Sequence, residues 1–384
     1  MDSIDFVDAK NIVLQPNQLL TPSKNVERSL TLDGLRGVAA LAVAVRHAPF
    51  LWIFGYPTQL FHESYLSVDF FFVLSGFVLT YAYDDRFRAG MSVWKFISVR
   101  LIRLYPLYAL AFAISFTIAM GRYFNGKLGM LDLLLNTFFA ILFVPSPFST
   151  NDLFPMNNPA WSLFFELVAN FVFGLVGRRL NAGILVTITF LSGVALILSV
   201  SFGWFGFGTD QGPMAAGNTW ISFIAGSLRV IYSFFCGSLV FRLWRASRYH
   251  FTLPPVVLIC GLCTILIAYP PENYAIEFDL FVTLVAFPLI VFIGAGSSSG
   301  KYTSQVFVFL GNLSYAIYVL QFPLYELMSF ILSKVHKFSG TSVVLGATCV
   351  AFSMLISILA DQYFDRPVRR VLTRYLATAF SGAG

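Results

Sequence analysis

Charged residues are scarce in this chain. Only 11% of its 384 residues are Asp, Glu, Lys or Arg, whereas 57% are hydrophobic and 43 are phenylalanine. An ordinary soluble domain has roughly 25% charged residues, and so few charges cannot cover the surface of an apolar chain folded in water. The scarcity excludes a cytosolic enzyme and a disordered tail protein. It indicates a polytopic membrane protein, because the lipid bilayer accepts such a surface.

Cysteine and histidine are also rare, with four residues of each. Because the cysteines lie inside apolar stretches, a disulfide scaffold is excluded, and Cys260-x-x-Cys263 is interpreted as a packing feature. His62, His250 and His336 gather no other residues at metal-ligand spacing, so no metal site is expected. The chain also lacks a P-loop, a serine nucleophile elbow and a Cys-His pair.

Basic residues exceed acidic ones by 25 to 19, which gives a formal net charge of +6. They cluster between apolar segments, a pattern typical of cytoplasmic loops, and no nucleic-acid partner is expected. Residues 1–28 carry seven charged side chains without an apolar core and are predicted to be a soluble tail, not a signal peptide. Residues 29–372 are predicted to form the membrane domain, and 373–384 a C-terminal tail.

Eleven apolar segments follow the N-terminal tail, and most are long enough to span a bilayer as helices. They cover residues 35–54, 66–83, 104–120, 128–144, 159–177, 183–204, 220–241, 254–270, 278–296, 306–332 and 342–363.

The basic loop after the second segment predicts that this loop and the N-terminus are cytoplasmic. If all eleven segments cross, the three later basic clusters at 178–179, 242–248 and 366–374 lie outside, which contradicts the positive-inside rule. If 128–144 enters and returns, all three become cytoplasmic. We therefore expect an all-α integral membrane protein with about ten transmembrane helices. Segment 128–144 is then re-entrant or interfacial, and both termini are cytoplasmic.

Ionisable residues at membrane depth indicate function, because a charge there costs about 3 kcal/mol or more. Arg36 and His47 are eleven residues apart on the first segment. On a helix this spacing is three turns plus about 20°, so both side chains lie on the same face. They are about 16 Å apart along the helix axis. This pattern favours a channel lined by both residues over a histidine satisfied by a neighbouring helix.

Two carboxylates are predicted at a depth similar to that of His47. Asp69 lies near the outer end of the second segment, and Glu166 lies about two turns into the fifth. A carboxylate beside an imidazole fixes its tautomer and raises its basicity. In the alternative interpretation, Asp69 pairs with Arg46 and does not orient His47. Three ionisable residues at one depth predict a polar cavity in the outer half of the bilayer.

Arg100 and Arg103 share a helix face at the cytoplasmic end of their segment. Planar guanidinium groups suit phosphate, so these residues, with Arg36, are candidates for binding a phosphorylated ligand. The alternative is ordinary positive charge that flanks a membrane helix.

Together these motifs resemble acyltransferase family 3, a family of integral membrane O-acyltransferases. The resemblance runs from about residue 29 to 372. The motifs are Leu32–Gly37 with His47, Asp69–Phe77, Arg100-x-x-Arg103-x-x-Pro106, Trp161–Glu166, Ser314–Pro323 and Asp365–Pro367. The family often has His where Gln321 stands and Glu where Asp365 stands.

The resemblance implies that an acyl group, which in this family is commonly acetyl, passes from cytoplasmic acyl-CoA to an acceptor hydroxyl. The acceptor would be a sugar of a surface or exported polysaccharide, or its lipid-linked precursor. The protein would lie in the cell (inner) membrane without a permanently bound cofactor. His47 would be the catalytic histidine with Arg36 as its motif partner, and Arg100 and Arg103 would bind the donor.

The resemblance also implies acceptor contacts at Trp161, Ser162, Tyr315, Tyr318 and Gln321. In the mechanism that we expect, neutral His47, oriented by Asp69 or Glu166, takes the proton from the acceptor hydroxyl. Alternatively, His47 is acylated first and passes the group on.

Three other functions compete with this interpretation. The acceptor could be a small secondary metabolite such as a macrolide. The chain could instead be a polar-solute transporter or flippase, although it has no paired repeat. A scaffold would not explain an arginine and a histidine on one helix stripe. Consumption of a thioester separates the enzyme from the transporter.

Overall fold

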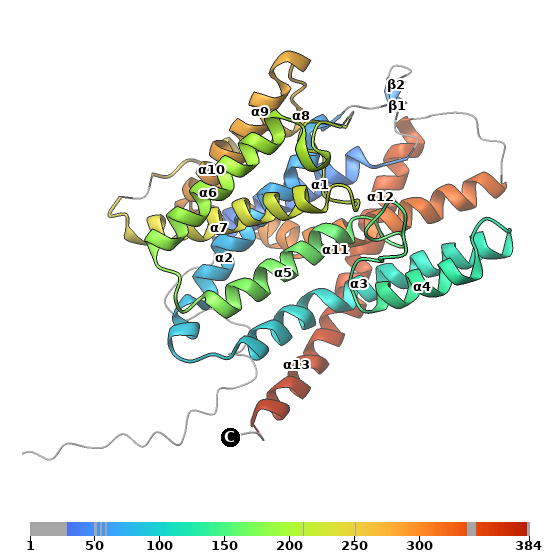
Figure 1. The fold of residues 1–384 in the computed structure, drawn as a ribbon, viewed down its shortest axis with the longest axis horizontal. Helices are drawn as coiled ribbons and strands as arrows, with labels where there is room; N and C mark the ends of the chain where they lie inside the picture. Colours follow the sequence, from blue (N-terminus) through green and yellow to red (C-terminus); the bar gives the residue numbers. More distant parts are fainter. Residues whose placement is uncertain are drawn as a thin grey trace, which may run out of the picture.

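The structure, a computed structural model, describes residues 29–49, 52–53, 56–57, 60–209, 211–249, 251–335 and 343–381. These residues form a bundle of helices with one pair of antiparallel strands, each two residues long (Figure 1). The tail predicted for residues 1–28 lies outside the described residues, and residues 373–381 continue the last helix.

The first half of the bundle contains α1 (Leu30–Arg46), β1 (Trp52–Ile53), β2 (Tyr56–Pro57), η2 (His62–Leu66), α2 (Ser67–Arg88), α3 (Val93–Phe124), α4 (Met130–Ile141), α5 (Ala160–Val176) and α6 (Ala182–Ser201). The second half contains η3 (Trp204–Gly206), α7 (Phe223–Ala246), α8 (Pro255–Ile267), η4 (Glu272–Tyr274), α9 (Ala275–Phe281), η5 (Val282–Ala286), α10 (Phe287–Gly296), α11 (Lys301–Val335), α12 (Val343–Ala360), η6 (Asp361–Asp365) and α13 (Arg366–Ser381). The segments η5 and η6 are π-helical turns inside longer helices.

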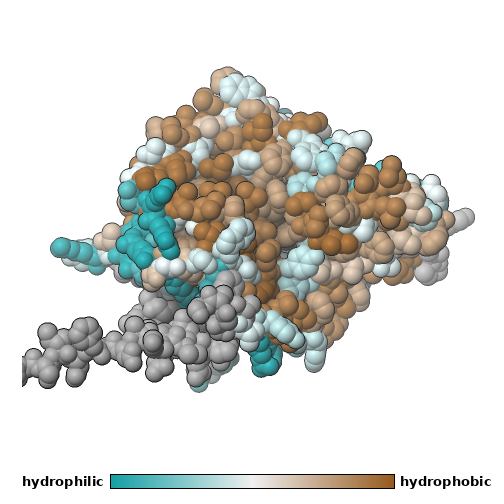
Figure 2. Space-filling model, turned by 60° about the horizontal axis from the view of Figure 1, so that its bottom comes forward, coloured by the Kyte–Doolittle hydropathy of each residue, from teal (hydrophilic) through white to brown (hydrophobic). Residues whose placement is uncertain are grey.

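Seven helical segments among the described residues have the length and apolar composition needed to cross a bilayer. They are 62–88, 93–124, 182–201, 223–246, 272–296, 301–332 and 343–378. Shorter apolar helices are α4, α5 and α8. Most of the face seen in Figure 2 is hydrophobic, and hydrophilic residues gather toward one side. The predicted all-helical, multi-pass membrane architecture is therefore confirmed.

Hydrogen bonds between loops bring several helix ends to one end of the bundle. The Arg178 guanidinium donates to the Phe87 carbonyl (3.0 Å), and Arg242 donates to the Leu180 carbonyl (3.0 Å) and the Asp84 carboxylate (2.6 Å). These bonds join the C-terminal end of α2, the loop after α5 and the C-terminal end of α7.

The start of α1 lies at the same end. Ser29 donates to the Gly294 carbonyl (2.9 Å), and Thr31 donates to the Ser297 carbonyl (2.9 Å). The Leu253 amide, just before α8 in the loop that follows α7, donates to Ser297 Oγ (3.3 Å). We call this the basic end, because it carries the arginines of the loops and of α13: Arg86, Arg88, Arg178, Arg179, Arg242, Arg245, Arg366, Arg369 and Arg370.

Other loops meet at the opposite end of the bundle. The Leu153 amide donates to the Asn218 carbonyl (2.9 Å), which joins the loop before α5 to the loop before α7. Asp279 of α9 accepts from the Met214 amide (3.1 Å) and from the Tyr65 hydroxyl (2.8 Å). The helix ends therefore sort into two groups, as they do in a membrane bundle.

The segment predicted to enter and return contains α4. This helix has 12 residues, about 18 Å, which is well short of a hydrocarbon core of about 30 Å. It packs along α3. The hydroxyls of Tyr105 and Tyr108, in the middle of α3, donate to the carbonyls of Ile141 (2.8 Å) and Ala140 (2.6 Å). α4 therefore ends beside the middle of α3, and does not run its full length.

Glycines allow two pairs of helices to approach closely. A Cβ at Gly76 of α2 would clash with the Phe234 carbonyl of α7, and one at Gly237 of α7 would clash with the Val73 carbonyl. In the same way, a Cβ at Gly311 of α11 would press on Asp33 of α1. Close packing of α1 on α11 brings the Arg36 side chain, one turn beyond Asp33, within reach of α11.

Candidate active site

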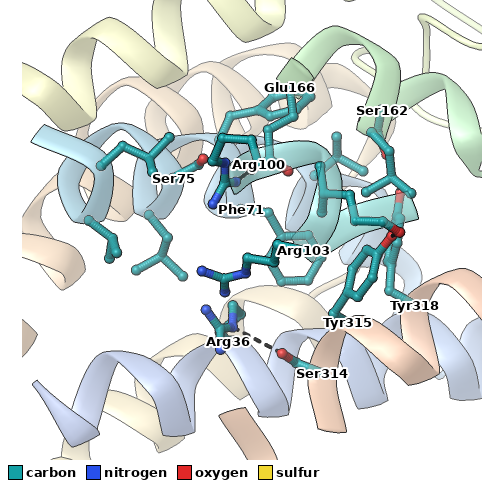
Figure 3. Close-up of a pocket in the computed structure, with 17 residues that line it drawn as sticks. Arg36, Phe71, Ser75, Arg100, Arg103, Ser162, Glu166, Ser314, Tyr315 and Tyr318 are labelled. Atoms are coloured by element: carbon teal, nitrogen blue, oxygen red, sulfur yellow. Dashed lines mark hydrogen bonds and ion pairs between the residues drawn. The ribbon is translucent and has the colours of Figure 1, made fainter. Parts of the chain in front are cut away.

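A cavity of about 110 Å³ lies among α1, α2, α3, α5 and α11. We call it the inner chamber; its lining residues include Arg36, Ser75, Arg100, Arg103, Ser162, Glu166, Ser314, Tyr315 and Tyr318 (Figure 3). The remaining wall is apolar and comes mostly from one face of α2, where lining residues recur from Val68 to Leu79. The lining stretch from Val68 to Leu79 spans eleven residue steps of helix, which is about 16 Å along the axis of α2. The chamber is thus a long, mostly apolar space with polar groups at a few points.

Three arginines converge at one side of the inner chamber (Figure 3). Arg36 comes from α1, whereas Arg100 and Arg103 lie one turn apart on α3. Arg36 is fixed by Asp33 (3.2 Å), by the Gly311 carbonyl (2.6 Å) and by Ser314 Oγ (2.9 Å). The predicted association of Arg36, Arg100 and Arg103 is therefore present in the structure.

Glu166 neutralises one of the three arginines. Its carboxylate accepts from Arg100 (2.8 Å) and from the Ser75 hydroxyl (2.8 Å). The buried Asn170 amide, oriented so that both of its groups are satisfied, accepts from Arg100 Nε at 3.1 Å. Arg100 is therefore held in place by α5. The charges of Arg36 and Arg100 each face a carboxylate.

Arg103 is different, because it makes no hydrogen bond or ion pair with any described residue. It lines the inner chamber, and its guanidinium points toward Arg36 in Figure 3. Two guanidinium groups that face each other without an intervening anion repel each other. A bound anion would relieve that repulsion. Arg103 is therefore the most available cation of the chamber.

The far side of the chamber carries hydroxyl groups. Tyr318 and Ser162 share a hydrogen bond of 2.7 Å, and Tyr315 donates to the Leu104 carbonyl (2.5 Å). All three residues line the chamber, as predicted for a substrate-binding wall. Trp161 and Gln321, predicted for the same role, are buried and do not line it.

A larger cavity of about 520 Å³ adjoins the inner chamber at the basic end. We call it the outer vestibule. The two spaces share six lining residues: Arg36, Leu74, Val78, Leu79, Arg100 and Arg103. Seven arginines and one carboxylate, Asp33, line the vestibule, and three of the arginines come from α13. A strongly cationic space therefore leads into a narrow apolar one.

His47 caps the C-terminal end of α1 and lies on the side of the opposite end of the bundle. Its Nδ1 is 2.8 Å from the Val43 carbonyl oxygen. Because a carbonyl only accepts, Nδ1 carries the hydrogen, and in the neutral ring Nε2 keeps its lone pair. His47 lines neither the inner chamber nor the outer vestibule, so the predicted channel shared with Arg36 includes only Arg36.

The prediction that Asp69 or Glu166 orients His47 is wrong for the described residues. Asp69 pairs with Arg229 of α7 at 2.5 Å, and both side chains are at most 1% exposed. Glu166 is bonded to Arg100 and Ser75. The alternative partner of Asp69, Arg46, does not hold it either. The backbone carbonyl of Val43 fixes the tautomer of His47 instead.

Arg229 is the residue that sequence reasoning missed. It lies inside the apolar segment 220–241, and a charge at that depth requires a partner, so the signal was present. Besides Asp69 it donates to the carbonyls of Ala216 (2.6 Å) and Tyr65 (3.1 Å), and it lies over the Trp161 ring at 5.6 Å. It thus ties α2, α5 and the loop before α7 together near the inner chamber.

The arginines of α13 were predicted only as cytoplasmic loop charge. Arg366, Arg369 and Arg370 line the vestibule with Thr373, at helical positions i, i+3, i+4 and i+7. That spacing was visible in the sequence, because such positions share one helix face. Among the described residues no group of three or more His, Cys, Asp or Glu side chains is placed to hold a metal ion.

Comparison with known proteins gives the same family as the motifs. A family model described as "Acyltransferase domain" matches residues 30–361. The chain is 27% identical over 333 residues to the exopolysaccharide production protein ExoZ of Rhizobium meliloti, covering 82% of this chain and 93% of ExoZ. It is 37% identical over 188 residues to protein 2 in the picA locus of Rhizobium radiobacter, covering 46% of this chain and 96% of that protein.

A third relative is the peptidoglycan O-acetyltransferase OatA of Listeria monocytogenes. It is 23% identical over 373 residues, which cover 88% of this chain and 56% of OatA. No solved structure matches the chain at a comparable level. Because the family model covers most of the chain, the chain belongs to acyltransferase family 3 and is a membrane acyltransferase.

Proposed function

We propose that this protein transfers an acyl group, acetyl in the simplest case, from cytoplasmic acyl-CoA to a hydroxyl of a surface or exported polysaccharide or its lipid-linked precursor. One observation carries the proposal. The cationic outer vestibule leads directly into the apolar inner chamber. Acyl-CoA has its groups in the matching order, because a polyanionic nucleotide is followed by a slender arm that carries the thioester.

The orientation in the membrane follows from charge. In this proposal the described part of the chain crosses the membrane ten times: by the seven long apolar helical segments with α3 among them, and also by α1, α5 and the short apolar helix α8. The arginine-rich loops gather at one end, and the positive-inside rule assigns that end to the cytoplasm. The protein would then lie in the cell (inner) membrane with both termini in the cytoplasm. The vestibule would open toward cytoplasmic acyl-CoA.

The arginines suit the donor's phosphates. Guanidinium groups bind phosphate oxygens in pairs, and a water-poor surrounding strengthens these bonds. Phosphates at Arg103 and its neighbours would direct the pantetheine arm past Ser75 and Glu166 into the chamber. The thioester would then pass the wall formed by Tyr315 and Tyr318 toward the end of α1, where His47 lies outside the chamber. The donor is a substrate in this scheme, and no permanently bound cofactor takes part.

The reaction assigns one proton transfer to His47. Nε2 takes the proton of the acceptor hydroxyl while the hydroxyl oxygen attacks the thioester carbonyl carbon. The new C–O bond forms, the C–S bond breaks, and the imidazolium returns its proton to the CoA thiolate. In the alternative order, His47 attacks the thioester first and passes the acyl group to the acceptor. The Val43 carbonyl supports both orders, because it keeps Nε2 unprotonated in the neutral ring.

Names of two relatives support a carbohydrate acceptor. ExoZ is named for exopolysaccharide production, and OatA for O-acetylation of peptidoglycan. In both cases the product is a polymer made at the cell surface. An acceptor hydroxyl would reach His47 from the opposite end of the bundle, where α1 ends. A macrolide acceptor remains the second candidate within the same chemistry.

The test is acetyl transfer by the purified protein in lipid nanodiscs. We expect acetyl-CoA to be consumed when a polysaccharide acceptor is added, with equal amounts of free CoA and O-acetyl ester formed. The His47→Ala and His47→Gln variants should lose at least a hundredfold in kcat, since general base catalysis contributes factors of this order. Full transfer by either variant would overturn the role of His47. A wild-type protein that never consumes acetyl-CoA but moves a polar solute would be a transporter.

A further inference from the structure

Resting on the proposed function, we propose that the outer vestibule is a nucleotide subsite that reads the 3′-phosphate of the donor's adenosine through Arg370 of α13. The adenine would lie against aromatic side chains of α2 and α7 that line the same space. The donor is then a CoA thioester, and an acyl group on a carrier without the nucleotide is a poor substrate.

The arginines of α13 form one surface of the vestibule. Arg366, Arg369, Arg370 and Thr373 all line it, at positions that share one helix face. The π turn η6 precedes them and shifts the helical register by one residue. α13 also packs on α3, the helix of Arg100 and Arg103. Two helices far apart in sequence therefore present their arginines to the same space.

Carboxylates hold two of the α13 arginines in place. Asp361 accepts from Arg366 (2.6 Å), and Asp365 accepts from Arg369 (2.6 Å). Arg370 has no carboxylate or hydrogen-bond partner among the described residues, and it is exposed to the vestibule. Arg366 and Arg369 are thus positioned and partly neutralised, whereas Arg370 keeps its full charge for a ligand.

The net charge of the vestibule matches a ligand with several phosphates. Its seven arginines are Arg36, Arg86, Arg100, Arg103, Arg366, Arg369 and Arg370. Ion pairs connect them to four carboxylates, those of Asp33, Glu166, Asp361 and Asp365. Two of these arginines, Arg103 and Arg370, form no ion pair with a described residue. A single phosphate could pair with only some of the vestibule's arginines, whereas the pyrophosphate and the separate 3′-phosphate of CoA could pair with several of them at once.

Aromatic residues form another part of the vestibule's lining. Phe77, Tyr81 and Tyr83 of α2 and Trp244 of α7 line the vestibule. Phe77 and Trp244 pack edge to face, with ring centroids 6.1 Å apart. Aromatic rings of this kind offer a stacking surface to a purine, whose flat face pairs with any π system. A cavity lined by both cations and aromatic rings suits an adenosine phosphate better than a bare polyanion.

The order of the groups along the vestibule assigns the phosphates. Arg103 belongs both to the vestibule and to the inner chamber, so it lies where the two join. Arg369 lines the vestibule together with Arg103, and its helix α13 packs on α3. The pyrophosphate, which directly precedes the pantetheine arm, therefore falls to Arg103 and Arg369. Arg370, the next residue on α13, would then bind the 3′-phosphate.

The test compares donors with and without the 3′-phosphate. For the wild type we expect the KM of acetyl-(3′-dephospho)-CoA to exceed that of acetyl-CoA about tenfold or more, the range of a charge-assisted hydrogen bond. Arg370→Ala should raise the KM of acetyl-CoA by a similar factor, leave that of the dephospho donor unchanged, and hardly alter kcat. Arg374→Ala is the matched control, since Arg374 lies one turn further along α13 and does not line the vestibule.

Binding provides a readout that does not need catalysis. Adenosine 3′,5′-bisphosphate should bind the wild type more tightly than adenosine 5′-monophosphate, and Arg370→Ala should remove this preference. Equal KM values for the two donors, or equal effects of Arg370→Ala and Arg374→Ala, would overturn the subsite. A wild type that binds the bisphosphate but consumes no donor would instead contradict the proposed acyl transfer and leave the subsite supported.

Discussion

At the scale of single residues, His47 and Asp69 show how close spacing in the sequence can mislead. Both lie toward the same end of antiparallel neighbouring helices, and a carboxylate would be a natural partner for the imidazole. Arg229 takes Asp69 instead, because a fully buried carboxylate needs a cation with matching geometry. His47 finds its partner one turn back in its own helix, at the Val43 carbonyl.

We expect Asp69→Asn to destabilise the protein by about 3–5 kcal/mol, because it leaves the buried charge of Arg229 without a partner. The double variant Asp69→Leu/Arg229→Met should recover much of this loss, since it removes both charges. Thermal unfolding in detergent measures the effect. A stable double variant with full acetyl transfer would show that Asp69 is structural and not catalytic.

The control for this prediction is Glu326→Gln. Glu326 pairs with Arg122 at 2.9 Å, with 28% and 48% of the two side chains exposed, so its loss should cost less than about 1 kcal/mol. An Asp69→Asn variant no less stable than Glu326→Gln would contradict the importance of the buried pair.

At the scale of elements, close approach of helices places the site residues. α2 supplies one wall of both cavities, and its path is set by contact with α7 at Gly76 and Gly237. In a bilayer lipid tails are as apolar as the side chains, so helices associate through tight packing of small residues. The glycines therefore decide how far Arg229 of α7 lies from Asp69 of α2.

Substitution of Gly76 or Gly237 by Ala should weaken the folded state markedly, because the new methyl group meets a backbone carbonyl of the other helix. Gly261→Ala in α8 is the control. Its Cβ would meet nothing within 4 Å, and replacing a helical glycine by alanine favours the helix by about 1 kcal/mol. Monodispersity in detergent and melting temperature measure both. Gly76→Ala as stable as Gly261→Ala would contradict the close packing.

At the scale of the whole molecule, charge and shape act together. The vestibule lies at the basic end and the inner chamber extends from it toward the opposite end, so a donor and an acceptor can meet from two sides of a membrane. The loops before α5 and α7 meet at the opposite end. This arrangement makes the orientation in the membrane directly testable.

Labelling of single cysteines tests the proposed orientation. In a background without Cys236, Cys260, Cys263 and Cys349, we expect Phe148→Cys to react with an impermeant maleimide in intact cells. Tyr375→Cys should react only after the membrane is opened. Both positions are well exposed, at 59% and 70%. Labelling of the two positions from the same side would contradict the ten crossings.

The sequence by itself determined the solvent, the helical class, the family and the clustering of basic residues between apolar segments. These properties depend on composition and helical period, which act locally along the chain. It also brought Arg36, Arg100 and Arg103 together, because their motifs lie at adjacent helix ends. Only the tertiary structure decided that Asp69 belongs to Arg229, 160 residues away, and that the arginines of α13 face those of α3. Such pairs depend on how each helix is rotated and packed against the others, and the helical period of one segment does not specify this.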